Sequence, residues 1–109
     1  MNCIFCKIAA GEIPADEVYR DDAIVAFRDL NPQAPVHILV IPTQHVSSAA
    51  EASEDVIGPL MVAAAQIAGE HIEGNGYRIV TNVGPDGGQS VEHLHLHVLG
   101  GRQMGWPPG

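Results

Sequence analysis

The sequence predicts an α+β domain in which an antiparallel β-sheet packs against helices on one of its faces. Several short segments are rich in apolar residues and end at Gly, Pro or Asp, which is typical of strands. One long segment, residues 53–73, instead repeats its apolar residues with the period of an amphipathic helix. The predicted order of the elements, β-β-β-α-β-β, favours this fold class.

The composition limits the kind of protein. A chain of 109 residues fits one domain, residues 1–109, with one modest core. A hydrophobic content of 46% predicts a soluble globular protein, and a net charge of −8 argues against nucleic-acid binding. The sequence has neither an apolar run of about 18 residues nor the pattern of a signal peptide. We therefore expect a cytoplasmic protein with no membrane partner.

The N-terminal part predicts a short helix and then a β-hairpin. Weak helical periodicity covers residues 3–10, and Gly11 and then Pro14 end this helix. Two apolar segments, 18–20 and 23–27, flank an Asp-Asp pair that is typical of a hairpin turn.

A central strand is predicted next. Residues 31–35 form a loop, because Asn and two prolines interrupt any regular pattern. Residues 36–41 are a nearly continuous apolar run, interrupted by His37, that ends at Pro42.

The long helix follows, with Ser53 as its N-cap. Gly58 and Pro59 are unfavourable inside a helix, so they mark either its true start or a kink.

The C-terminal part predicts two strands, 77–83 and 91–99, joined by the glycine-rich loop 84–90. The residues 106–109, Trp-Pro-Pro-Gly, cannot form regular structure. A tryptophan in so short a tail is expected to dock on another surface.

The most informative motif is the run His93-Leu94-His95-Leu96-His97. In a strand, the leucines and Val98 would bury one face while the imidazoles line the other. A metal site, a catalytic site and chance decoration compete as explanations. One metal cannot hold all three, because His93 and His97 would lie about 13 Å apart, and the alternating apolar residues argue against chance. Nucleophilic or acid–base catalysis is favoured, because imidazole attacks phosphorus and shuttles protons at neutral pH.

The loop before this run predicts an anion site. Its glycines allow backbone N–H groups to converge, and Asn82, Gln89 and Ser90 add side-chain donors. We therefore expect a phosphate cradle without basic residues.

Cys3 and Cys6 form a C-x-x-C motif, which in a reducing compartment indicates metal or redox chemistry. Zinc would need two more ligands, and the candidates are the six histidines: His37, His45, His71, His93, His95 and His97. From spacing alone, a zinc site and a free dithiol both remain open.

Taken together, these motifs resemble the histidine triad (HIT) family. The run from His93 to Leu99 matches its alternating pattern, and the tail 100–109 resembles the histidine triad nucleotide-binding (HINT) branch. So do residues 32–35 and 86–90, and the resemblance covers nearly the whole chain. It implies a HIT-like antiparallel sheet of about five strands with one long and one short helix, which dimerises into a continuous sheet.

The resemblance also implies a reaction. His95 would attack the α-phosphorus of a purine nucleotide to form a nucleotidyl-histidine, which water then hydrolyses. His97 and Ser90 would hold the phosphate, and His37 would orient the nucleophile. The implied activity is a purine nucleoside phosphoramidase; the alternatives are a dinucleoside polyphosphate hydrolase or nucleotidyl transferase, and a nucleotide-binding adaptor with vestigial catalysis.

The implied nucleotide contacts are distributed along the chain. Asp29 would accept the ribose hydroxyls, and an apolar pocket would hold the base. The full nucleotide-binding set is Asn82, Gly88, Gln89, Ser90, Asp29, Phe27, Leu30, Ile4, Phe5, Ile13 and Trp106. In the implied homodimer, the tail 100–109 would reach the partner's site. Relatives carry a histidine where this chain has Gly105, which bears on the leaving group.

Finally, the resemblance implies a structural zinc ion held by Cys3, Cys6, His45 and His93. This assignment leaves His95 and His97 free for chemistry.

Overall fold

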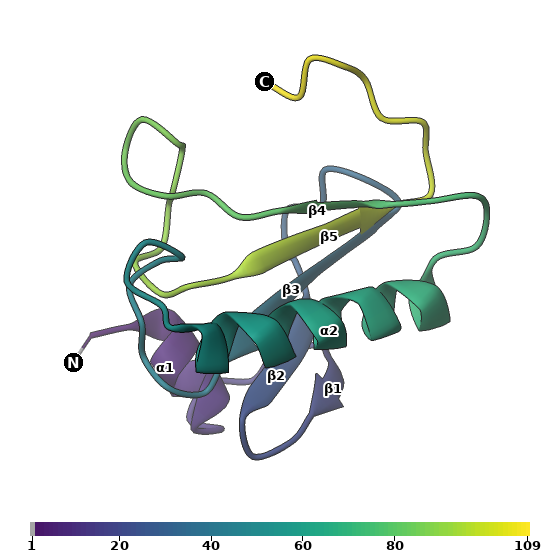
Figure 1. Ribbon diagram of the computed structural model, residues 1–109. Helices are drawn as coiled ribbons and strands as arrows, with labels where there is room; N and C mark the ends of the chain where they lie inside the picture. The colour runs from purple at the N-terminus through teal and green to yellow at the C-terminus, as the bar shows by residue number, and fades with distance from the viewer. Residues whose placement is uncertain (1) are drawn as a thin grey trace.

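The computed structural model describes residues 2–109 and contains one five-stranded antiparallel sheet with two helices (Figure 1). The elements in chain order are α1 (Ile4–Ala9), β1 (Glu17–Arg20), β2 (Ile24–Arg28), β3 (Val36–Pro42), α2 (Glu54–His71), β4 (Arg78–Val80) and β5 (Leu96–Gly100). The order across the sheet is β1-β2-β3-β5-β4, and every neighbouring pair is antiparallel. The predicted α+β class and the number of strands are confirmed.

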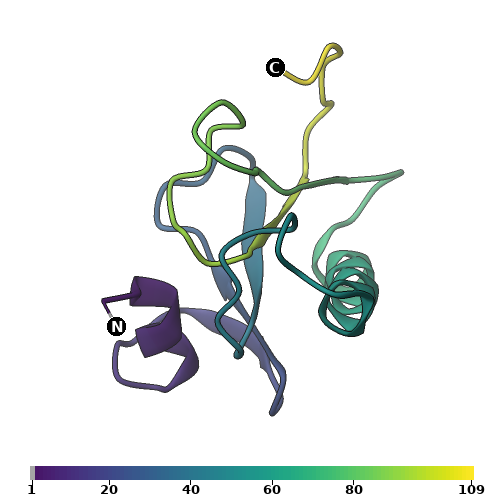
Figure 2. The ribbon, with the colours of Figure 1, turned by 60° about the vertical axis from the view of Figure 1, so that its left-hand side comes forward.

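The two helices cover opposite faces of the sheet (Figure 2). Leu60 and Ile67 of α2 pack with Ile38 on one face, whereas Phe5 of α1 packs with Phe27 on the other. The prediction that helices cover one face only is therefore wrong. The reason is visible in β2 and β3, whose consecutive apolar residues point alternately to both faces, so that both need cover.

The hairpin and the long helix follow the sequence with small differences. Asp21 closes the turn between β1 and β2, because its carboxylate accepts from the N–H groups of Ala23 and Ile24. Helix α2 begins at Glu54 and continues through Pro59, so the Gly-Pro pair does not mark its start. Ser53 is the N-cap, but its side chain makes no capping hydrogen bond.

Strand β5 is shorter than the predicted strand 91–99. It begins at Leu96, and the preceding backbone turns toward another partner: the N–H of Leu94 donates to the carbonyl of Val46 at 2.7 Å. The alternation nevertheless persists, because Leu94, Leu96 and Val98 are all buried in the core beneath α2. The histidines between them therefore point toward the α1 face. Strand β4 is likewise confined to three residues of the predicted 77–83.

The C-terminal tail leaves the sheet after β5 and runs away from it (Figure 1). Arg78 of β4 donates to the carbonyl of Gly105 at 2.7 Å, whereas Trp106 is 83% exposed. Trp106 thus does not dock on its own chain. Neither helix of the described chain has the length and apolar character that spanning a bilayer requires.

Candidate active site and candidate metal centre

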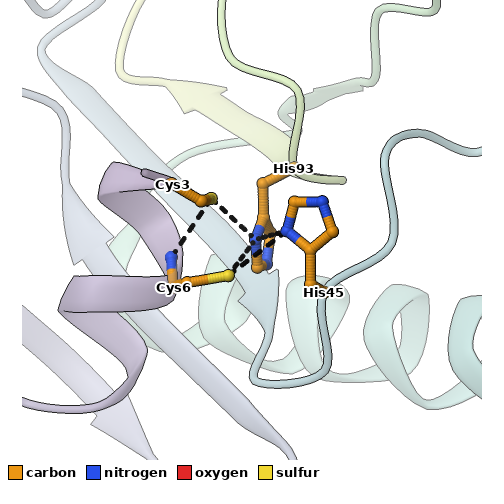
Figure 3. Close-up of side chains that lie close together, drawn as sticks. All are labelled: Cys3, Cys6, His45 and His93. Atoms are coloured by element: carbon orange, nitrogen blue, oxygen red, sulfur yellow. Dashed lines mark hydrogen bonds between the residues drawn. The ribbon is translucent and has the colours of Figure 1, made fainter. Parts of the chain in front are cut away.

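Two groups of histidines lie on the α1 face. The first group, the Cys/His cluster, contains Cys3, Cys6, His45 and His93 (Figure 3). Nδ1 of His93 lies 3.4 Å from Sγ of Cys3, 3.5 Å from Sγ of Cys6 and 3.2 Å from Nδ1 of His45. Sγ of Cys6 lies 3.2 Å from Nδ1 of His45. Residues far apart in the sequence thus bring four ligand atoms to one point.

The Cys/His cluster fits a tetrahedral metal ion. Zinc bonds of about 2.3 Å to sulfur and about 2.0 Å to nitrogen separate neighbouring ligand atoms by roughly 3.3–3.8 Å. The four separations given above, 3.2–3.5 Å, are close to these values, and all four ligand atoms lie within 4.8 Å of one another. Nε2 of His93 bonds to the carbonyl of Pro42 at 2.8 Å, so its proton is on Nε2 and the lone pair of Nδ1 faces the cysteines.

A bound cation would change the protonation of the Cys6 thiol. Burial, and then the neighbouring Cys3, raises the pKa of Cys6, because a second thiolate is unfavourable at this place. A bound divalent cation reverses that preference and deprotonates the ligating thiols.

The second group, the histidine relay, contains His37 of β3 and His97 of β5. These strands pair side by side, and Nε2 of His37 lies 2.9 Å from Nδ1 of His97. The backbone N–H of Gln33 donates to Nδ1 of His37 at 3.0 Å, which fixes the proton of a neutral His37 on Nε2. His37 therefore donates to His97, and the proton of His97 lies on Nε2.

This position of the protons makes the histidine relay, unlike the Cys/His cluster, a poor metal site. Asp29, His37 and His97 also lie close enough together to hold an ion. However, Nε2 of His37 carries a hydrogen and offers no lone pair to a metal. Burial, as the largest cause, lowers the pKa of His37, and it lowers that of His97 to about 4, so both are neutral at pH 7.

His95 lies between the two groups, and the hydrogen bonding of its ring differs from that in either group. Its Nδ1 donates to the carbonyl of His93 at 2.7 Å, because a carbonyl can only accept. The lone pair of a neutral His95 is therefore on Nε2. The ring of Phe5 meets His95 edge-on at 5.1 Å and His93 at 6.0 Å, so one aromatic side chain contacts both the cluster and the nucleophile candidate.

A cavity of about 280 Å³ opens beside His95 and His97, and its lining is mostly apolar. Nine of the predicted site residues line it: Ile4, Phe5, Ile13, Phe27, Asp29, Leu30, Ser90, His95 and His97. A mostly apolar lining with a few polar groups is typical of a small-molecule site. A larger cavity of about 540 Å³, between residues 73–78 and 101–104, contains none of the predicted site residues.

The glycine-rich loop turns its backbone donors inward in this conformation. The N–H groups of Gly88 and Gln89 donate to the carbonyls of Pro85 and Gly84 inside the loop. The side-chain amide of Gln89 donates to Ser47 and Val91, so it braces the loop instead of facing an anion. In this conformation both side-chain donors of Gln89 are used within the protein, so its role toward an anion stays a prediction.

Two other predicted residues lie outside this cavity lining, namely Asn82 and Trp106. His37 does not line it either, but it reaches the site through His97.

Several residues of the site were missed by the sequence reasoning. Gln33 sets the proton of His37, and the hydroxyl of Thr81 donates to the carbonyl of His95 at 2.9 Å. Pro14 and Ala15 add to the cavity wall. Only Thr81 had a usable signal, because it is a polar residue directly before Asn82 in a predicted strand.

The comparisons with known proteins agree with this architecture. The model of the HIT domain matches residues 10–104. A 14 kDa zinc-binding protein of Zea mays is 50% identical over 97% of this chain and 87% of its own length. An adenylylsulfatase HINT1 of Arabidopsis thaliana is 49% identical over 97% of this chain and 76% of its own length.

A solved structure is also similar. A HIT family hydrolase from Legionella pneumophila superposes with a TM-score of 0.93 at 50% identity and covers 99% of this chain and 100% of its own. The fold and the histidine arrangement define a histidine triad protein. The chain belongs to the HIT domain family.

Proposed function

We propose that the protein is a hydrolase that cleaves purine nucleoside 5′-phosphoramidates through a nucleotidyl intermediate on His95. The observation that carries the proposal is the hydrogen bond from Nδ1 of His95 to the carbonyl of His93. It leaves a lone pair on Nε2 of a ring that lines the cavity. A buried imidazole with this tautomer is a nucleophile that needs no prior loss of a proton.

The reaction proceeds in two displacements. Nε2 of His95 forms a bond to the α-phosphorus while the P–N bond breaks, and the leaving amine keeps the electron pair and takes a proton from solvent. Water then attacks the phosphorus and gives up a proton to solvent, the P–Nε2 bond breaks, and a nucleoside monophosphate leaves. The electron pair returns to His95.

Neutral donors stabilise the phosphate in this proposal. The proton on Nε2 of His97 is available to a phosphoryl oxygen, and the hydroxyl of Ser90 lines the same cavity. Asn82 and the backbone of Gly88 and Gln89 contribute only if the loop rearranges, since the two backbone N–H groups are bonded within it. His37 acts through His97.

The nucleoside occupies the rest of the cavity. The apolar wall formed by Ile4, Phe5, Ile13, Phe27 and Leu30 accepts the purine. Asp29 receives the ribose hydroxyls; one of its oxygens accepts from the N–H of Asn31, which fixes the carboxylate.

We further propose that zinc occupies the Cys/His cluster in a structural role. A closed set of four ligands supplies no open position for a substrate, which is typical of structural zinc. The name of the Zea mays relative supports this choice of metal.

The protein is proposed to act as a homodimer. Strand β4 lies at one edge of the sheet, so two such edges can join into a continuous sheet. The exposed Trp106 would then reach the partner's cavity. Light scattering of the purified protein tests this state; a monomer at micromolar concentration contradicts it.

A second candidate substrate is adenylyl sulfate, which the name of the Arabidopsis relative favours. The attack on phosphorus is the same, and sulfate replaces the amine as the leaving group.

The test is to trap the intermediate. The protein is mixed with an adenosine phosphoramidate, adenylyl sulfate or a dinucleoside polyphosphate, quenched within milliseconds, digested and measured by mass spectrometry. We expect a nucleotidyl adduct on His95, with the phosphoramidate giving the highest turnover. An adduct on another residue, or none with any substrate, contradicts the mechanism.

A further inference from the structure

A chain of hydrogen bonds joins the C-terminal tail to the histidine relay. Nε and Nη2 of Arg102 both donate to the carbonyl of Gln33, at 3.2 and 3.0 Å. The N–H of Gln33 donates to Nδ1 of His37 at 3.0 Å, and Nε2 of His37 bonds to Nδ1 of His97 at 2.9 Å. The carbonyl of Gln33 is thus held by the tail, and its N–H contacts the histidine relay.

The fold brings these segments together at one end of the sheet. Val36, at the start of β3, pairs with Gly100, at the end of β5. Gly101 has a φ of +90°, and a Cβ at this position would lie 2.9 Å from Cβ of Pro35. A glycine is therefore required for the tail to turn at once across the loop 31–35, which places Arg102 over Gln33.

We propose that Arg102 is a positioning residue that selects the proton arrangement of His97 through Gln33 and His37. The proposal rests on the proposed function, in which Nε2–H of His97 faces the phosphate. Arg102 does not line the cavity beside His95 and His97.

The reason lies in the competition around His37. Nε2 of His37 is 2.9 Å from His97 and 3.4 Å from a carboxylate oxygen of Asp29. While the Gln33 N–H faces Nδ1, a proton on Nδ1 would place two donors against each other, so Nε2 must carry it. If Gln33 moves away, both tautomers of His37 become accessible. His97 then loses its donor at Nδ1, and its own proton can move there from Nε2.

Arg78 provides a matched control. It is also an arginine that holds the tail, but it donates to the carbonyl of Gly105 and makes no hydrogen bond to Gln33. A general loosening of the tail would follow from either Arg78→Met or Arg102→Met. An effect through Gln33 would follow from Arg102→Met alone.

The first measurement is made without substrate. Long-range ¹H–¹⁵N NMR at pH 8 reports which ring nitrogen of each neutral histidine carries the proton. We expect Nε2–H for His37 and His97 in the wild type and in Arg78→Met, and a mixture of tautomers for both residues in Arg102→Met. Unchanged tautomers in Arg102→Met, or equal changes in the two variants, would overturn the proposal.

The second measurement is turnover of an adenosine phosphoramidate. Arg102→Met should lower kcat about tenfold with KM within about twofold, because a donor that acts in the transition state is lost. Arg102→Lys, which keeps one donor, should recover part of kcat. Altered tautomers with unchanged kcat would also overturn the proposal. A wild type that forms no adduct on His95 refutes the proposed function instead, and the substrate-free NMR comparison distinguishes the two failures.

Discussion

The Cys/His cluster and the histidine relay use the same side chain in opposite ways. In the cluster, His93 turns its lone pair inward and commits its proton to the carbonyl of Pro42. In the relay, His37 commits its proton to His97 and its lone pair to the N–H of Gln33. The difference shows that the backbone groups behind each ring, rather than the histidine motif itself, decide whether the ring turns a lone pair or a proton toward its side-chain neighbours.

His95→Ala should give the largest effect, and this effect should be on turnover alone. We expect turnover of an adenosine phosphoramidate to fall by about 10³-fold or more, since the nucleophile is removed. Binding of adenosine monophosphate and the zinc content, measured by calorimetry and by metal analysis, should remain. Loss of zinc in this variant would show that the two regions are not separate.

Cys3→Ser should act first on zinc binding and on stability. Metal analysis should find less than one zinc per chain, and the free energy of unfolding in urea should fall by several kcal/mol, because structural zinc contributes directly to folding. Cys3→Ser removes a ligand without removing a group of the relay. A variant that keeps full zinc and stability would contradict the assignment of this ligand.

The pH dependence of stability tests whether the relay is neutral. The pKa of His97 is lowered from 6.5 to about 4, mainly by burial, so between these values the unfolded chain binds a proton that the folded chain does not. Stability should therefore decrease as the pH falls from 6.5 to about 4, and this group adds nothing further below that.

The corresponding measurement is thermal unfolding at pH values from 8 to 4 for the wild type and His97→Gln. The wild type should lose more of its melting temperature over this range than the variant does. Acid loss of zinc affects both proteins, so the difference between them isolates His97. Parallel curves would show that His97 titrates normally.

Thr81→Val should give the smallest effect. It removes the hydroxyl that donates to the carbonyl of His95 while keeping the shape of the side chain. A lost neutral hydrogen bond of about 1 kcal/mol predicts a roughly fivefold lower kcat. Zinc content should not change; steady-state kinetics and metal analysis check both points.

The sequence predicted the pattern of side chains better than the backbone around them. The alternation of His93 to Val98 placed the imidazoles on one face, and the family resemblance named the residues that converge at each group. The sequence did not predict that β5 starts only at Leu96, because the hydrogen bond from Leu94 to Val46 joins segments distant in the chain. The same limit applies to the loop at Gly88 and Gln89, whose backbone N–H groups bond to carbonyls within the loop in a way that no sequence pattern predicts.

The side of the sheet that each helix covers was also beyond local reasoning. Periodicity shows that the helix over residues 3–10 has one apolar side. Which face of the sheet this side packs against depends on the register of β2 and β3, which the periodicity does not show. Likewise, no pattern marks Gln33, whose contribution to the relay is a backbone N–H that every residue except proline carries.

Helix α1 has only six residues, far fewer than a helix needs to persist alone. Its ends are tied down by different means, since Cys3 and Cys6 join the cluster and Arg20 donates to the carbonyls of Ile8 and Ala9. Between these ties, Ile4, Phe5 and Ile8 form one wall of the cavity. The wall and the candidate metal centre thus share one folding unit. If zinc binding changes the affinity for a nucleotide by some factor, thermodynamic linkage requires that nucleotide binding change the affinity for zinc by the same factor.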